Sequence, residues 1–296
     1  MTSGPAFWIG LVASAAGLAT SAGVLSARDA RFAEPPFADR LLYVQSGEVA
    51  DRLLLQFDAV AADVYWIRAI QHFGRDRRSS RPDRFTLLEP LLDLTTTLDP
   101  HFNVAYRFGA IFLAVEPPDG AGRPDQAIAL LEKGLRESPD RWQLAHDLGF
   151  VHYWFTGETL EAARWFERAG AMPGAPAWVL PLAAVTRAQG GDRDGARRLL
   201  GQLAGTSETY VRNAAERGLL QLQALDALDQ LQVLIAEAHA RLGRAPASWA
   251  DVFPDRPGQV PLDPAGVPFV YDPERGRAVL SPDSRLHPLP VLPVSR

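Results

Sequence analysis

The chain has 296 residues, no cysteine and a formal net charge of −5. With 47% hydrophobic and 22% charged residues, it has the composition of a globular protein that can bury a core. The lack of cysteine excludes disulfides, cysteine-ligated zinc and a thiol nucleophile, and the negative charge argues against general nucleic-acid binding.

Residues 1–27 are predicted to form a membrane anchor. They contain an uncharged run, Ala6–Leu25, of about the length needed to cross a bilayer. A cleaved signal peptide is the alternative, although such peptides normally carry a basic region that is missing here. Arg28, Arg31 and Arg40 follow the run, and by the positive-inside rule they favour a cytoplasmic body.

Residues 28–61 are predicted to form a stalk and a leading helix. Two prolines, Pro35 and Pro36, stop any helix in the stalk, and residues 41–44 favour a short strand. Apolar residues at three- and four-residue spacing then predict a helix from Gly47 to Phe73. The arginine-rich stretch 74–84 breaks this pattern, either as a solvated connector or as a contact for acidic lipids or an acidic partner.

A repeat occupies residues 62–215. Its clearest positions are Ala127, Ala162 and Ala196, which are 35 and 34 residues apart, each followed four residues later by a bulky side chain: Leu131, Phe166 and Leu200. Upstream of each alanine, an amphipathic helix is predicted with a small residue near its middle: Gly109, Gly149 and Ala184. Small residues at these places let two helices pack closely as a hairpin.

This pattern resembles the tetratricopeptide repeat family, which repeats every 34 residues or so. Phe108-Gly109 and Leu148-Gly149 match its Leu-Gly pair, and Pro139 and Pro173 match its terminal proline. The likeness weakens in the first unit, where Pro90 is expected to interrupt the second helix, and in the fourth, which lacks the proline. The resemblance implies an α-solenoid of stacked helix hairpins, whose first helices line a concave face that binds a partner.

The resemblance also implies a peptide-binding groove on that face. Its candidate residues are Tyr106, His146, Phe150, Tyr153 and Trp178, with Asn103, Leu113, Gln143, Trp154 and Val185 at neighbouring positions. Aromatic side chains there would hold an apolar or helical peptide, because aromatic anchors dominate interface energies. Packing between repeats is the alternative for several of them, and it is the favoured one for Trp154.

Residues 216–296 are predicted to form a long helix and a β-hairpin cap. The helix is expected from Glu216 to Gly243, and a turn with a short helix at 245–253. Two β-like runs follow, at Val267–Tyr271 and Arg277–Leu280. The hairpin is expected to close the end of the repeats, and a docking surface is the alternative.

This ending resembles the C-terminal half of bacterial pseudopilins. The likeness is carried by Asp263, Pro264, Gly266, Pro268, Tyr271 and Asp272. The hydrophobic N-terminal run lies far away and lacks a prepilin-peptidase motif, so the chain is not a pilin. Calcium binding by Asp263, Asp272 and Asp283 is one possibility, and a purely turn-forming role is the other.

The sequence lacks the common catalytic motifs, namely GxSxG, SxxK, HExxH, a phosphate loop and GxGxxG. We therefore expect no catalytic residues, cofactor, metal or small-molecule substrate. The prediction is a mainly α protein: a non-catalytic, membrane-anchored scaffold or assembly factor of a bacterial envelope complex. The body is expected in the periplasm on the inner membrane, because the pseudopilin-like end suits that compartment. A cytoplasmic body, and a cytoplasmic adaptor or an accessory domain of an enzyme, are the alternatives.

Overall fold

The computed structural model describes residues 20, 21, 23, 58–80, 84–256 and 258–290. This part of the chain is mainly helical, as predicted. Within it no helix is both long and apolar enough to cross a membrane. The proposed anchor Ala6–Leu25, the strand at 41–44 and the start of the leading helix fall almost wholly outside the described residues.

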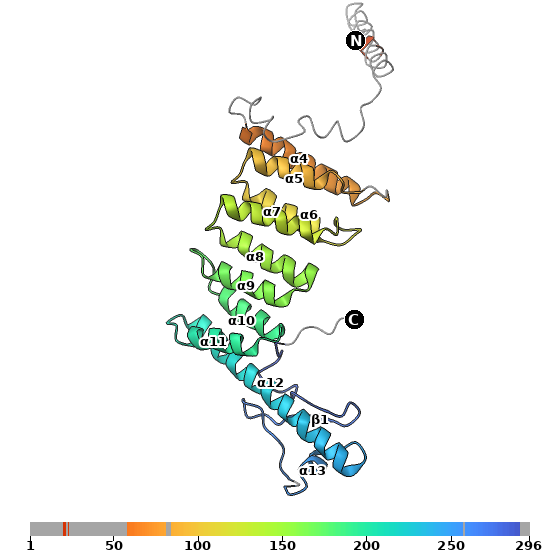
Figure 1. Cartoon of the computed structure of the whole chain (residues 1–296), viewed down its shortest axis with the longest axis vertical. Coiled ribbons are helices and arrows are strands. Elements are labelled where there is room, and N and C mark those ends of the chain that lie inside the picture. The colour runs from red at the N-terminus through yellow and green to blue at the C-terminus, as the bar shows by residue number, and fades with distance from the viewer. Residues whose placement is uncertain (1–19, 22, 24–57, 81–83, 257, 291–296) are drawn as a thin grey trace, which may run out of the picture.

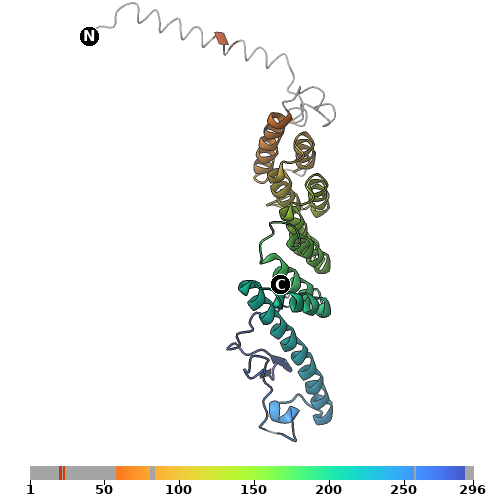
Figure 2. The same cartoon turned by 90° about the vertical axis from the view of Figure 1, so that its left-hand side faces the viewer.

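The helices follow one another in antiparallel pairs. Their bounds are α4 (Asp58–Asp76) with α5 (Leu88–Leu98), α6 (Asn103–Ala114) with α7 (Pro124–Glu137), α8 (Trp142–Val151) with α9 (Thr159–Gly170), and α10 (Val179–Gln189) with α11 (Arg193–Ala204). A π-helical turn, η1 (His152–Thr156), extends α8. Each helix packs mainly on its neighbours in the chain, and the pairs form an elongated stack that ends at the long helix α12 (Thr209–Leu242) (Figures 1 and 2).

Small residues lie where the helices of a pair meet. Ala127, Ala162 and Ala196 are completely buried. Gly149 of α8 is so close to α9 that a Cβ atom there would lie 2.6 Å from the ring of Phe166. The amphipathic helices bury their apolar sides on this close contact, which is why the small residues recur with the period of the helix pairs.

The packing of α6 corrects the predicted alignment of the first helices. The buried residues of α6 are Ala105, Tyr106, Gly109, Ala110, Leu113 and Ala114, and those of α8 include Leu144, Ala145, Leu148 and Gly149. The buried positions of α6 coincide with those of α8 when the two sequences are aligned so that Ala110, and not Gly109, corresponds to Gly149. One residue turns a helix by about 100°, so the alignment on Gly109 assigned the wrong residues of α6 to the groove.

Two helix boundaries also differ from expectation. Pro90 does not interrupt α5, because the helix begins at Leu88 and the proline lies in its first turn, where no hydrogen-bonded N–H is needed. Helix α12 begins at Thr209 and not at Glu216, so its first turns still belong to the stack. Its end is as predicted: Gly243 follows it with φ +66°, a left-handed conformation that favours glycine.

The C-terminal segment folds back onto α12 (Figure 1). It contains the short helix α13 (Trp249–Val252) and the strands β1 (Val270–Asp272) and β2 (Arg277–Val279). The strands pair antiparallel, with Tyr271 opposite Ala278, and this confirms the predicted hairpin. A cluster of buried side chains joins the segment to α12: Ala224, Leu231, Phe269, Leu280 and Leu286.

Candidate functional site

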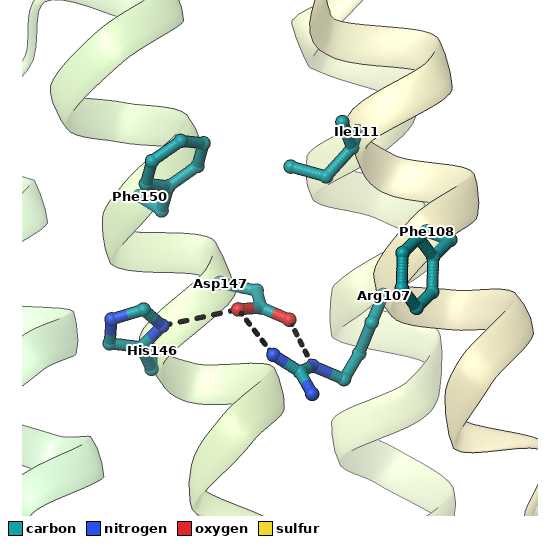
Figure 3. A pocket seen from close by; sticks show the side chains of 6 residues that line it. All are labelled: Arg107, Phe108, Ile111, His146, Asp147 and Phe150. Atoms are coloured by element: carbon teal, nitrogen blue, oxygen red, sulfur yellow. Dashed lines mark hydrogen bonds and ion pairs between the residues drawn. The ribbon is translucent and has the colours of Figure 1, made fainter.

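A hollow opens between α6 and α8, the first helices of two successive pairs. It has a volume of about 230 Å³ and is lined by Arg107, Phe108, Ile111, His146, Asp147 and Phe150. Figure 3 shows Ile111 and Phe150 facing one another across the space between the two helices. Phe108 is 54% exposed, which is high for so large an apolar side chain.

Charged and polar groups lie on one side of the hollow (Figure 3). The Arg107 guanidinium donates to both carboxylate oxygens of Asp147, with Nε–Oδ2 at 2.5 Å and Nη2–Oδ1 at 3.3 Å. His146 Nδ1 lies 3.1 Å from Oδ1 of the same carboxylate. Because Asp147 is largely buried and faces a cation, the pair joins α6 to α8 and leaves the hollow close to neutral.

Aromatic rings continue the surface from this hollow toward α10. The ring of Trp178 stands edge-on to that of His146, with the centroids 5.4 Å apart, and it makes a similar contact with Trp142. Trp178 remains 41% exposed. The surface therefore offers aromatic area across three successive first helices.

The structure places the predicted groove residues in different environments. His146 and Phe150 line the hollow, and Trp178 adjoins it. Tyr153 is half-buried and donates its hydroxyl to Gln189 Oε1, 3.0 Å away. Trp154, which was expected to pack between repeats, is 62% exposed.

Tyr106 does not belong to the groove. Its ring is 1% exposed within the core, and its hydroxyl donates to the carbonyl of Thr96. Burial, chiefly, raises the pKa of this hydroxyl to about 12. Leu113 is also in the core. Both follow from the one-residue error in the alignment of α6.

That error hid two of the lining residues, Arg107 and Ile111, which correspond to His146 and Phe150 of α8; Phe108 and Asp147 lie at a position that the groove prediction left out. One signal in the sequence points to Phe108 and Ile111. Helix α6 carries apolar residues on a second side as well, at Val104, Phe108 and Ile111, whereas a helix with one solvated face needs a single apolar stripe. Nothing local marks Asp147 as the partner of Arg107.

Two acidic residues of the C-terminal segment stabilise turns by accepting hydrogen bonds from backbone amides. Asp263 accepts hydrogen bonds from the amides of Ala265 and Val267, and Asp272 accepts from those of Glu274 and Arg275. In the described part of the chain, no group of three or more His, Cys, Asp or Glu side chains could hold a metal ion.

The lining of the hollow is apolar on its walls and charged or polar at one edge. None of the six lining residues carries a hydroxyl or a thiol, and the single carboxylate is held by Arg107. The apolar walls with a small polar edge suit the burial of an apolar side chain.

Comparison of the chain with protein-family models, with curated proteins and with solved structures finds no match. The likeness to tetratricopeptide repeats therefore rests on the residues and the helix pairs described above.

Proposed function

We propose that this protein is a non-catalytic scaffold that binds a segment of a partner protein on the face formed by α6, α8 and α10. The proposal rests on one observation, the hollow between α6 and α8 with Phe108, Ile111 and Phe150 around it. An apolar side chain of the partner would insert between Phe108 and Phe150 and remove both rings from water.

The energetics favour this use of the surface. A buried large apolar side chain contributes about 1.5–3 kcal/mol, and aromatic side chains are enriched among the few residues that dominate binding. The Arg107–Asp147 pair at the edge adds polar groups for the partner's main chain without leaving an unpaired charge.

We further propose that the stacked pairs are a tetratricopeptide-type α-solenoid. Two observations support this: the buried small residues Ala127, Ala162 and Ala196 at the helix-pair contacts, and the packing of each helix mainly on its neighbours in the chain. In such an array the first helices share one face, which is where the hollow lies.

The envelope role is also a proposal, and it rests on the sequence. Ala6–Leu25 would anchor the scaffold in the inner membrane, with the body in the periplasm. An alkaline phosphatase fused after Arg296 is expected to be active. An inactive fusion, together with an active cytoplasmic reporter at the same position, would place the body in the cytoplasm and leave the scaffold proposal standing.

A displayed library of random peptides tests the binding function. Peptides selected on the wild-type protein should bind the double variant Phe108→Ala, Phe150→Ala at least ten-fold more weakly, about 1.4 kcal/mol or more by calorimetry. The matched control is Val104→Ala with Trp154→Ala, which removes exposed side chains from the same chain segments outside the hollow. Equal affinity for the two double variants, with helical circular dichroism unchanged, would refute the proposed site.

A further inference from the structure

A second cavity lies at the end of the stack, between α10 and α12, and the chain's own C-terminal segment reaches it. The cavity measures about 510 Å³. Its lining combines residues of α10, of α12 and of the segment itself: Val185, Gln189, Tyr210, Asn213, Ala214, Arg217, Gln221, Pro288, Leu289 and Pro290. The described chain ends at Pro290, in the wall of this cavity.

The segment reaches the cavity by running back along α12 toward the start of that helix. Near the hairpin, Gln232 of α12 donates to the carbonyl of Gly276. Three turns earlier on the helix, Gln221 donates to the carbonyls of Leu286 (2.9 Å) and Pro288 (2.7 Å). One further turn back, Arg217 donates to the carbonyl of His287.

These contacts hold the segment by its main chain and by its apolar side chains. Gln221 is 8% exposed, so its amide is committed to the two carbonyls and not shared with bulk water. Leu286 is 1% exposed, and Leu289 packs against two of the buried clusters on α12. Pro290 is buried as well. The segment is therefore bound firmly up to the cavity wall.

The cavity belongs to the same face as the hollow between α6 and α8. Val211, Ala215 and Gly218 are buried in α12 at the spacing of Val179, Ala183 and Thr186 in α10. By that correspondence Tyr210 takes the place of Trp178, and both are exposed, at 64% and 41%. The face that presents aromatic side chains on α8 and α10 thus continues onto α12.

Helix α12 carries a further hydrogen-bond donor beyond those that bind carbonyls of the C-terminal segment. Asn213, Arg217 and Gln221 are spaced by four residues, so they lie on one side of the helix. Arg217 and Gln221 already bind carbonyls of the segment, whereas Asn213 is an exposed amide in the cavity wall. Next in the sequence come Val291, Leu292, Pro293 and Val294, which suit a cavity walled by Val185, Ala214, Leu289 and two prolines.

We infer that residues 291–294 of the chain occupy this cavity, with the Asn213 amide on a carbonyl that follows Pro290. The C-terminal segment is then a tethered ligand that fills the α12 end of the concave face. Side chains of α12 hold the described part of this segment by the carbonyls of Leu286, His287 and Pro288. This inference does not rest on the proposed function, because the hollow between α6 and α8 and this cavity share no lining residue.

Disulfide trapping tests the inference cleanly, because the chain has no cysteine of its own. One cysteine replaces Tyr210 or Asn213, and a second replaces Val291, Leu292 or Val294 in turn. The control pairs the same C-terminal positions with Val233→Cys, an exposed residue of α12 outside the cavity. Dilute protein is oxidised gently, and the products are resolved on non-reducing gels.

We expect at least one pair with Tyr210 or Asn213 to close within the monomer about ten-fold faster or more than any control pair, because a tail lying in the cavity raises the effective concentration of its thiol at the cavity wall and not at Val233. Equal rates for cavity and control pairs would overturn the inference. Disulfide-linked dimers as the main product would also overturn it, and would show that a second copy fills the cavity. Using both Tyr210 and Asn213 guards against a substitution that disturbs one wall.

Discussion

Gly149 shows how single residues set the distance between helices in this protein. A Cβ atom at this position would lie 2.6 Å from the Phe166 ring and 3.0 Å from the carbonyl oxygen of Ala162. The ring is nearly buried, and the carbonyl belongs to the backbone of α9, so neither can move away freely. Gly201 of α11, in contrast, has no neighbouring atom within 4 Å of such a Cβ.

We therefore expect opposite effects from the same substitution at the two glycines. Gly149→Ala should lower the free energy of unfolding by about 1–3 kcal/mol, because it overpacks the contact between α8 and α9. Gly201→Ala should raise it by up to about 1 kcal/mol, because alanine favours the helix. Urea unfolding of both variants measures the difference, and a stabilised Gly149→Ala protein would contradict the close contact.

Asp263 is a second residue with an effect beyond its own turn. Its carboxylate is 5% exposed and accepts from two amides and from Ser284 Oγ, 2.5 Å away. Burial raises the pKa of this carboxyl, but the hydrogen bonds from Ser284 and from the backbone outweigh burial and bring the pKa below its ordinary value. The ionised carboxylate thus joins the loop before β1 to the segment after β2.

The sign of the pH dependence follows from that depressed pKa. The stabilisation is fully present above the unfolded value, about 3.9, and it is lost as the pH falls through the lower folded value. Asp263→Asn should cost about 1–3 kcal/mol at pH 7, and the gap to the wild type should close in acid. Chemical unfolding between pH 2 and pH 7 checks this; Asp283→Asn, at an exposed position, should show no such gap.

Between elements, ion pairs join α11 to α12. Arg193 donates to Asp229 at 2.5 Å and to Asp226 at 3.2 Å, and Arg197 donates to Asp226 at 2.6 Å. Arg193 and Arg197 share the carboxylate of Asp226, so these groups form a network, although Asp229 is largely exposed. Such a network contributes more to stability than a single exposed ion pair, whose contribution is small.

Removing the central cation of this network should weaken the contact between the two helices. We expect Arg193→Ala to cost about 1 kcal/mol at low salt and less in 1 M NaCl, where charges are screened. The matched control is Arg164→Ala, which removes a pair with Glu161 inside α9 alone and should cost under about 0.5 kcal/mol. Urea unfolding at two salt concentrations compares them; identical losses would mean that the network adds nothing.

At the scale of the whole molecule, each helix packs mainly on helices that are adjacent in the chain, and this arrangement governs how far a local defect spreads. Helix α5 packs on α4, α6 and α7, while α12 packs chiefly on α11, α10 and the C-terminal elements. The core is correspondingly divided, with one large buried cluster from Ala62 to Val179 and separate clusters on α12. In such an array stability depends on the contacts between adjacent units.

A defect at one end should therefore stay local. Leu92 of α5 is completely buried, so Leu92→Ala should cost about 2–5 kcal/mol where it packs. Hydrogen exchange followed by mass spectrometry should show faster exchange in α4–α7, with α12 and β1–β2 unchanged. Faster exchange throughout the chain would show instead that the molecule unfolds as one cooperative unit.

Much of the helical order could be predicted from the sequence because its causes are local. The recurrence of Ala127, Ala162 and Ala196, the glycine after α12, and the β-like runs around Pro273 each act through neighbouring residues. These signals placed the helix pairs and the hairpin. For the candidate site they found His146 and Phe150 of α8 and Trp178 directly before α10, where the alignment of the repeats was right.

Only the tertiary structure decided the rest, because it depends on contacts between distant residues. The loop between α6 and α7 lengthens the first full unit, so spacing alone did not fix which side of α6 packs inward; burial of Tyr106 and exposure of Phe108 did. The pairing of Arg107 with Asp147 spans 40 residues, and that of Gln221 with Leu286 spans 65. A shift of one residue turns a helix side chain by about 100°, so the packed core selected the residues that line the hollow between α6 and α8.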